Sequence, residues 1–270
     1  MRLAAIHVFP LKGARGVSLE RAEVLAGGLR HDRRFMLVGD DGRFLSQRTS
    51  PALALVTTAL VRGPDGATSL AIGVPGSAPA MVKLPPDVAS LPRRRVGIWH
   101  DEVEAVVVPS PVVEQLEAHL GQRCSLVFMP DEVVRPVELP YGAPGDRVGF
   151  ADGYPLLLAK TASLADLNAR LAEPVPIDRF RANLVVEGGR AFDEEQHPRV
   201  RVGAVTFRMA KRCARCQVIT IDQASAAVGR EPLATLASYR AEDGKVYFAM
   251  NLIPDREGAI ATGDEVAYID

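Results

Sequence analysis

The chain has 270 residues, of which 47% are hydrophobic and 24% charged, and its formal net charge at pH 7 is −1. These values are typical of a soluble globular protein with one large or two modest domains. The near-neutral charge gives no argument for a nucleic acid or an anionic membrane, so we expect neither as a partner.

The cysteine usage and the N-terminus predict a cytoplasmic protein. The three cysteines have no disulfide-framework spacing, which favours a reducing compartment. The apolar start of the chain breaks at His7 and Pro10. It is therefore too short for a signal-peptide core or a membrane span.

The first part of the chain is predicted to be rich in β-strands. The turn residues around Gly42 predict a strand–turn–strand unit, with strands at 34–38 and 43–47. Further β-prone runs at 53–61 and 69–74 are separated by Gly/Pro turns. We expect an N-terminal β-barrel-like domain over 1–95 and a second domain over 96–270, with the boundary between 90 and 125.

The middle of the chain combines a helix signal with a long loop signal. Ser110 at an N-cap, Pro111 in the first turn and Gly121 at the stop predict a helix over 110–121. After a short strand at 126–128, a Pro/Gly-rich stretch to Gly149 predicts an irregular loop. Long loops of this kind are often functional.

The last hundred residues alternate between strand and helix signals. Leucines on one face and a Ser163/Asp166 capping arrangement predict a helix over 163–171. We expect a short helix at 232–239, and strands at 181–186, 200–209 and 263–269. The predicted fold class is α+β and β-rich: an N-terminal β-barrel-like domain packed on a second β-barrel with peripheral helices.

Two of the three cysteines form a cationic motif. Cys213-Ala-Arg-Cys216 follows Lys211-Arg212 and precedes a strand-like run at 218–222. A neighbouring positive charge lowers the pKa of a thiol and favours the thiolate, which attacks electrophiles and binds metals. We therefore expect the chemistry of the protein at this motif.

The motif chemistry alone leaves four interpretations open. A structural zinc site needs four Cys/His ligands, and only Cys124 and five scattered histidines remain. A thioredoxin-like dithiol needs a helix after the motif, but β-branched residues follow it. The other two are a pair of half-buried thiols without a role, and a thiolate that binds a soft or high-valent metal or carries sulfur, with the cations holding an anionic cofactor.

The pattern around the cysteines resembles the MOSC domain (molybdenum cofactor sulfurase C-terminal). The resemblance is to the branch with the mitochondrial amidoxime-reducing component and its bacterial relatives. It is carried by residues 211–222, 229–233 and 236–240, and by 162–168 and 180–184. Residues 9–13, 32–38 and 44–48 resemble the N-terminal β-barrel domain of that family. The matches follow the family's order from about residue 6 to the end of the chain.

The resemblance implies a pterin-based molybdenum cofactor (Mo-molybdopterin) bound between the two domains. In the family the second cysteine of the motif is the metal ligand, which implies Cys216 as the ligand and the catalytic residue. The further residues implied in cofactor binding are Lys12, Arg34, Arg48, Thr161, Ser163, Arg181, Asn183 and Arg215. Arginine suits the cofactor phosphate, the Asn183 amide the pterin edge, and Thr161 or Ser163 a phosphate at a helix start. Gly13 departs from the family, in which serine often follows the lysine.

The function implied by the resemblance is the reduction of N-hydroxylated compounds, N–OH to N–H. No cluster of four cysteines follows the MOSC-like segment. We therefore expect the electrons to come from a separate ferredoxin- or flavoprotein-like donor protein. The alternative is a sulfur carrier or molybdenum-cofactor carrier with a persulfide-competent cysteine and no redox turnover. A degenerate domain that only binds a partner is a weaker third interpretation.

Overall fold

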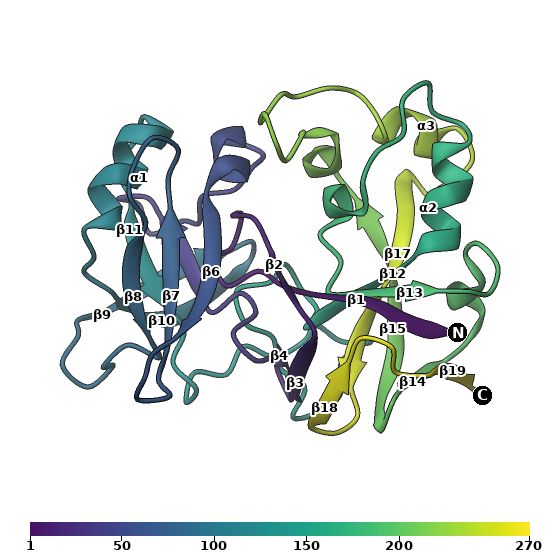
Figure 1. Ribbon diagram of the computed structural model, residues 1–270, viewed down its shortest axis with the longest axis horizontal. Coiled ribbons are helices and arrows are strands. Elements are labelled where there is room, and N and C mark those ends of the chain that lie inside the picture. Colours follow the sequence, from purple (N-terminus) through teal and green to yellow (C-terminus); the bar gives the residue numbers. More distant parts are fainter.

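Four β-sheets form the framework of the computed structural model, which describes residues 1–270. Figure 1 shows two lobes side by side, with the N-terminal strands crossing between them. The second lobe, which holds both termini, contains a nine-stranded sheet in the order β19-β14-β15-β17-β12-β13-β1-β2, with β16 paired to β17. Its strands are β1 (Arg2–Val8), β2 (Val17–Leu19), β12 (Leu156–Lys160), β13 (Leu184–Glu187), β14 (Arg199–Val202), β15 (Val205–Arg215), β16 (Ala241–Glu242), β17 (Lys245–Pro254) and β19 (Val266–Ile269).

The first lobe is built from the middle of the N-terminal half. One sheet has the order β5-β11-β10-β9 and a second the order β6-β7-β8. Their strands are β5 (Phe35–Val38), β6 (Thr57–Arg62), β7 (Thr68–Gly73), β8 (Ala80–Leu84), β9 (Arg93–Ile98), β10 (Asp101–Val107) and β11 (Ser125–Phe128). A fourth sheet, β18-β3-β4, pairs the two ends of the chain. Its strands are β3 (Arg21–Leu25), β4 (Gly28–Leu29) and β18 (Gly258–Ala261).

The helices are short and lie at the edges of the lobes (Figure 1). The α-helices are α1 (Val112–Leu120), α2 (Thr161–Asn168) and α3 (Leu233–Ala237). The 3-10 helices are η1 (Pro51–Leu55), η2 (Ile177–Phe180), η3 (Asp193–Gln196) and η4 (Gln217–Thr220). None of the helices has the length and apolar composition needed to cross a bilayer. The fold is therefore β-rich α+β with peripheral helices, as predicted.

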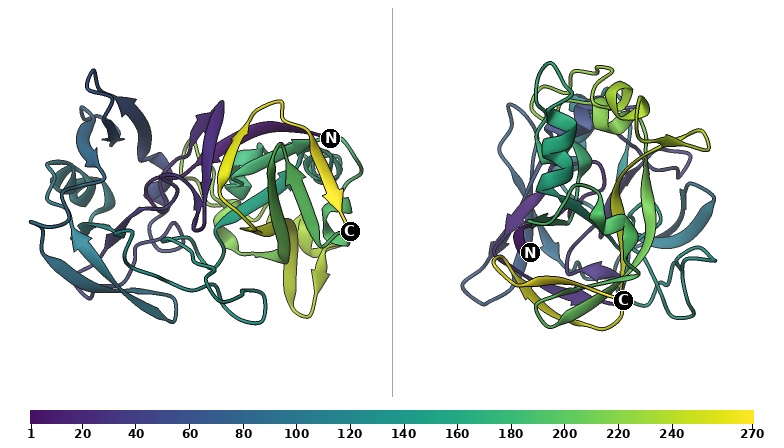
Figure 2. Two further views of the ribbon diagram at one scale, coloured as in Figure 1. Left: turned by 90° about the horizontal axis from the view of Figure 1, so that it is seen from below. Right: turned by 90° about the vertical axis from the view of Figure 1, so that its right-hand side faces the viewer.

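Strand alternation explains where the cores lie. Along β1 the side chains of Leu3, Ile6 and Val8 are buried, whereas Arg2 and Ala4 are exposed. A register shift between Leu3 and Ala5 puts Leu3 on the same face as Ile6 and Val8, so one face of the strand packs on a core. These residues join the core of the second lobe, together with side chains from β14, β15 and β17. In the right-hand view of Figure 2 the strands of this lobe curl around that interior.

The two lobes are joined by buried polar contacts as well as by the chain. The carboxamides of Gln47 and Gln223 exchange two hydrogen bonds of 3.1 Å, and both side chains are buried. The Gln47 amide also donates to the carbonyl of Gly13 at 2.6 Å. Arg15 Nη2 donates to the carbonyl of Gln223 at 2.7 Å. These contacts fix the edge of the first lobe against the loop that follows the cysteine motif.

Several element predictions are confirmed. Strand β7 lies within one residue of the predicted strand at 69–74, and α3 occupies the predicted short helix. Helix α1 ends at Gly121 in the left-handed conformation at φ 65°, as the stop signal predicted. Between β11 and β12 the chain contains no strand or helix, so the long loop is also confirmed.

Other predictions were wrong because tertiary contacts decided the local structure. The run at 218–222 is not a strand: the chain turns into η4, and Thr220 Oγ1 donates to the carbonyl of Gln217 at 2.8 Å. Residues 43–47 form no strand; Phe44 makes only an isolated bridge to Val38. The run at 53–61 is divided between η1 and β6.

The C-terminal half shows similar differences. The predicted strand at 200–209 is a hairpin of β14 and β15, with Gly203 in the turn at φ 53°. Helix α2 begins at Thr161, so Ser163 is inside the helix and does not form the predicted capping arrangement. The strand predicted at 181–186 begins at Leu184, since Arg181 has the left-handed φ of 54°.

The boundary near residue 95 remains a prediction. Residue 95 lies within β9, which pairs with β10 from Arg93↔Val106 to Ile98↔Asp101. Strand β1 pairs with β13 in the second lobe. The first residues of the chain therefore belong to the second lobe and not to the first.

Candidate functional site

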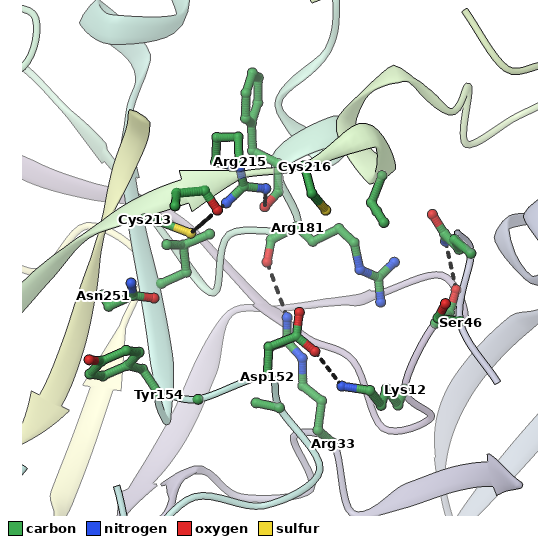
Figure 3. Close-up of a pocket in the computed structure, with 18 of the residues that line it drawn as sticks. Lys12, Arg33, Ser46, Asp152, Tyr154, Arg181, Cys213, Arg215, Cys216 and Asn251 are labelled. Atoms are coloured by element: carbon green, nitrogen blue, oxygen red, sulfur yellow. Dashed lines mark hydrogen bonds and ion pairs between the residues drawn. The ribbon is translucent and has the colours of Figure 1, made fainter. Parts of the chain in front are cut away.

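A cavity of about 190 Å³ lies where the two lobes meet. Its lining comes from segments distant in sequence: the turn after β1, the segment after β5, the β9–β10 turn, the start of β12 and the end of β15. Figure 3 shows the polar side chains converging on it. The two cysteines of the motif and the predicted residues Lys12, Arg48, Arg181, Asn183 and Arg215 all line this cavity.

The cysteine motif enters the cavity at the end of a long strand. Cys213 lies on β15, and Cys216 is the first residue after the strand, at the N-cap of η4. Arg215 Nη1 donates to Cys213 Sγ at 2.9 Å, and its Nη2 donates to the carbonyl of Phe180 at 3.0 Å. The Sγ of Cys216 makes no hydrogen bond and remains available to a ligand (Figure 3).

Two arginines share one aromatic platform. The guanidinium groups of Arg33 and Arg181 lie 4.2 and 4.4 Å from the centroid of the Phe9 ring. Arg33 also pairs with the buried Asp32 at 2.6 Å. The side chain of Arg181 makes no hydrogen bond or ion pair, and burial, reinforced by Arg33, lowers its pKa to about 9. Arg181 is only partly buried, and its guanidinium lines the cavity without an anionic partner, so it is available to an anion there.

A lysine and an aspartate form an ion pair in the wall of the cavity. Lys12 Nζ donates to Asp152 Oδ1 at 2.5 Å and to the carbonyl of Phe150 at 2.7 Å. Burial lowers the pKa of Lys12, against the opposing effect of Asp152. Burial by itself would raise the pKa of Asp152, but Lys12 and the Trp99 N–H hold it well below its usual range. Asp152 therefore presents an ionised carboxylate whose second oxygen is free.

The single tryptophan of the chain lies at the rim. Trp99 occupies the β9–β10 turn at φ 56°, which is a strained conformation for a bulky residue. Its Nε1 donates to Asp152 Oδ1 at 3.2 Å, and the guanidinium of Arg48 lies 4.4 Å from its ring centroid. The strained turn thus positions both a carboxylate and a cation.

Three predicted cofactor residues lie outside the cavity lining. Arg34 pairs with Asp131 at 2.7 Å and donates to the carbonyl of Met129 at 3.2 Å, and all three residues line a separate, smaller pocket. Thr161 lies at the first position of α2, and the buried Ser163 Oγ accepts the N–H of Phe192 at 2.9 Å. These three residues therefore do not contact the cavity that the other predicted residues share.

Asn183 lines the cavity, but its amide is already engaged. Its Oδ1 accepts from Arg33 Nη1 at 3.0 Å and from the N–H of Leu157 at 3.1 Å. Its Nδ2 donates to the carbonyl of His7 at 3.0 Å. We therefore expect Asn183 to hold Arg33 and the strand ends in place.

Sequence reasoning missed several residues of the cavity. Arg33 is adjacent to Arg34, and strand alternation alone does not say which one faces a ligand. Asp152 follows the long Pro/Gly-rich loop, which was a signal of function without a named residue. Tyr154 and Asn251 carried no motif signal. All four line the cavity.

Cys124 lies far from the motif in the fold. It is buried in the core of the first lobe, beside α1, where burial raises the pKa of its thiol to about 11. It therefore does not complete a four-ligand zinc site with Cys213 and Cys216. No group of three or more His, Cys, Asp or Glu side chains suited to a metal ion occurs in the structure.

Two family models match the chain. The model of the MOSC domain matches residues 145–267, and that of the MOSC N-terminal beta barrel domain matches residues 1–123. The zebrafish Danio rerio has a relative named mitochondrial amidoxime-reducing component 1. It is 31% identical over 248 residues, which cover 88% of this chain and 74% of the relative.

Other relatives have a different name and length. The molybdenum cofactor sulfurase of rice (Oryza sativa subsp. japonica) is 29% identical over 279 residues, which cover 93% of this chain. The match covers 32% of the rice protein, so this chain spans about a third of that relative. Among solved structures, the YuaD protein of Bacillus subtilis matches with a TM-score of 0.45 and 11% identity, over 98% of this chain and 93% of that one.

Proposed function

Because the chain belongs to the MOSC domain family, with the N-terminal β-barrel domain ahead of the MOSC domain, we propose that it binds the molybdenum cofactor in the cavity between the lobes. There it reduces N-hydroxylated compounds to the parent N–H compounds. In this reaction the N–O bond breaks, two electrons and two protons are consumed, and water leaves. A relative with the name amidoxime-reducing component supports this reaction class.

The observation that carries the proposal is the position of Cys216. Its sulfur has no hydrogen-bond partner and faces a cavity that also contains the unpaired cation of Arg181. A thiolate is a soft donor suited to a transition metal, and binding requires its deprotonation. A thiolate and an unpaired cation in one cavity fit a ligand that has both a metal and an anionic group.

The cations of the cavity fit the phosphate of such a cofactor. Arg181 has no other partner, and Arg48 is held only by the Trp99 ring. Guanidinium groups bind phosphate oxygens in pairs of parallel hydrogen bonds. We assign Arg181, Arg33 and Arg48 to the anionic part of the cofactor. Arg215 has a different task, because its guanidinium is held between Cys213 and Phe180.

The carboxylate of Asp152 fits the N–H groups of the pterin ring. One oxygen is occupied by Lys12 and Trp99, and the other has no partner. Because the carboxyl remains ionised, its free oxygen can accept a hydrogen bond but cannot donate one. It therefore pairs with an N–H or O–H group of the ligand. Lys12 thereby acts through Asp152, whose position and charge it fixes.

When bound, the cofactor supplies the two-electron redox chemistry, and the chain supplies orientation and electrostatics. Cys216 fixes the metal end, the arginines fix the anionic end, and the cavity keeps one side open for the substrate. The electrons come from a separate donor protein. The three cysteines are free, which supports a cytoplasmic location.

A second candidate function is sulfur transfer or cofactor delivery. The contact of Arg215 with Cys213 favours it, since a guanidinium N–H stabilises negative charge on a sulfur atom. The rice relative is named a sulfurase. In this case one cysteine carries a persulfide and no redox turnover occurs.

The deciding experiment measures molybdenum and pterin in the protein purified from a host that makes the cofactor. We expect near-stoichiometric metal in the wild type and in Cys124→Ala, the matched control, and its loss in Cys216→Ala. The wild type should reduce an N-hydroxylated probe with a chemical electron donor. A stable extra sulfur on a cysteine, without pterin, supports the second candidate. Full metal content in Cys216→Ala contradicts the proposal.

A further inference from the structure

A second hollow lies on the outer face of the cysteine motif. It is an open groove of about 610 Å³ on the second lobe, beside α3, which Figure 1 shows at the outer edge of that lobe. Its lining comes from the end of β15, from η4 and the loop after it, from α3 and from the start of β17. Ala214 and Arg215 line both this groove and the cavity. The end of β15 therefore separates the groove from the cavity.

The groove brings the protein surface close to Cys216. The neighbours of this cysteine in the chain, Arg215 and Gln217, both line the groove, whereas Cys216 itself lines the cavity. Arg215 is paired across the sheet with Val246 of β17, which lines the groove as well. The metal ligand that we propose is therefore bonded on each side to a residue of the groove wall. This arrangement gives a short route from the outer surface to the redox centre.

The charged residues that line the groove are all cations. They are Arg215, Arg230 and Lys245, and the lining contains no aspartate or glutamate. Arg230 and Lys245 are exposed and form no ion pair within the chain. Two free cations on the wall of one groove attract a partner with negative charge on its surface.

Three carboxylates are close to the groove in sequence but do not line it. Glu242 pairs with Arg212 at 2.7 Å, and Glu231 accepts the N–H of Thr235 at 3.0 Å. Only Asp243, in the turn between β16 and β17, has no such partner. The groove therefore keeps a positive balance of charge, although the net charge of the whole chain is −1.

An exposed apolar side chain lies in the same groove. Val228, on the loop after η4, lines the groove and is 61% exposed. Backbone hydrogen bonds hold this loop against η4, among them the N–H of Gly229 to the carbonyl of Thr220 at 3.1 Å. Leu233 and Ala234 of α3 extend the apolar surface. A small apolar area with free cations suits a transient redox complex, which buries less than about 1,200 Å² and forms quickly through charge attraction.

We propose that this groove is the docking surface for the electron donor, and that the donor is a small acidic protein that carries one electron. This inference rests on the proposed function. Each reduced donor molecule gives up one electron and leaves oxidised, so two encounters supply the two electrons that N–O cleavage consumes together with two protons. The electrons enter on the groove side of Cys216, and the substrate occupies the cavity on the other side. Donor and substrate therefore do not compete for one opening.

The test uses the cofactor-loaded protein and a plant-type [2Fe–2S] ferredoxin, which is an acidic one-electron carrier. The double variant Arg230→Glu, Lys245→Glu reverses the two free cations of the groove. The double variant Arg62→Glu, Lys83→Glu is the matched control, because these exposed cations also form no ion pair but lie on β6 and β8 of the first lobe. Reduction of N-hydroxybenzamidine is measured with reduced ferredoxin and with reduced methyl viologen. Ferredoxin binding is measured separately by calorimetry at low and at high salt.

We expect the groove variant to bind ferredoxin about tenfold more weakly than the wild type and to turn over about tenfold more slowly with it. High salt should weaken wild-type binding, because it screens exposed charges. Turnover with methyl viologen should stay at the wild-type rate, and the control variant should match the wild type in every assay.

The inference is overturned by a wild type that does not bind ferredoxin, by unchanged binding in the groove variant, or by equal losses in the groove and control variants. Loss of methyl viologen turnover in the groove variant also overturns it, because the two cations then support the cofactor site. A wild type that does not turn over with methyl viologen shows instead that the proposed function fails. The ferredoxin titration then decides by itself whether the groove is a docking surface.

Discussion

Arg215 donates a hydrogen bond to the sulfur of Cys213 at 2.9 Å, although Cys216 is its direct neighbour in the chain. The strand places Arg215 and Cys213 on the same side, two residues apart, whereas Cys216 begins the next turn. The motif therefore contains one cysteine held by a cation and one that is free to bind a ligand. This difference between the two sulfurs leads to the first prediction.

Replacing Cys213 should affect stability but not metal binding. Cys213→Ala removes the acceptor of Arg215, whose Nε already has no partner, and we expect a loss of about 1–2 kcal/mol in the free energy of unfolding. Cys213→Ser keeps an acceptor and should lose less. Both variants should retain molybdenum; urea unfolding and metal analysis check this. Loss of metal in both would identify Cys213 as a ligand.

A substitution outside the main cavity should disturb cofactor binding. A Cβ at Gly16 would lie 2.7 Å from the ring of Phe9, which carries the guanidinium groups of Arg33 and Arg181. Since Phe9 is buried, its ring must shift and move both arginines. We expect Gly16→Ala to reduce the pterin content several-fold, measured after oxidation to a fluorescent product. Gly27→Ala is the control, because its Cβ would meet only ordinary contacts at 3.8 Å.

Arg181 should show a trade-off between function and stability. Its partly buried guanidinium has no anionic partner and lies beside the cation of Arg33, so Arg181→Gln should stabilise the cofactor-free protein by about 1 kcal/mol, or about 2–4 °C in Tm. The same variant should bind less cofactor. Thermal unfolding of protein from a cofactor-deficient host tests the first effect. A large drop in Tm would mean that the guanidinium supports the fold, contrary to this interpretation.

Glu194 should make the stability of the protein depend on pH. The side chain is fully buried beside α2, Oε1 accepts from Ser163 Oγ at 3.4 Å, and Oε2 has no partner. Burial, helped by Glu195 and Asp193 and opposed by Lys160, raises the pKa of Glu194 from 4.5 to about 7. The folded state therefore binds a proton more tightly than the unfolded state does.

It follows that the contribution of Glu194 is favourable below pH 4.5 and is lost as the pH rises toward 7. The difference corresponds to about 3 kcal/mol, at about 1.36 kcal/mol per pH unit. Glu194→Gln should remove this dependence and be more stable than the wild type at pH 8. Urea unfolding at pH 5 and pH 8 measures both proteins. A parallel pH profile in the two would contradict the assignment.

Local signals in the sequence were reliable where a single residue type has one conformational role. Gly121 ended α1 because glycine adopts the left-handed conformation without a steric penalty. The local signals failed where side-chain hydrogen bonds or tertiary contacts decided the conformation of the backbone. The β-branched run after Cys216 became η4, in which the Thr220 hydroxyl donates to the carbonyl of Gln217. The apolar pattern at 200–209 gave no sign of the hairpin turn at Gly203.

The residues of the functional site also fall into two groups: those that the sequence predicts and those that only the fold brings together. The sequence by itself determined the family and the cysteine motif, and it identified most of the cations, because these depend on residue types in a fixed order. Only the tertiary structure decided which of them share a cavity. Arg33 faces it while Arg34 turns to Asp131, because Arg33 has the left-handed φ of 46° in the turn before β5, which redirects the chain between the two side chains. Asp152, Tyr154 and Asn251 come from a loop and a strand that meet only when the two lobes close around the motif.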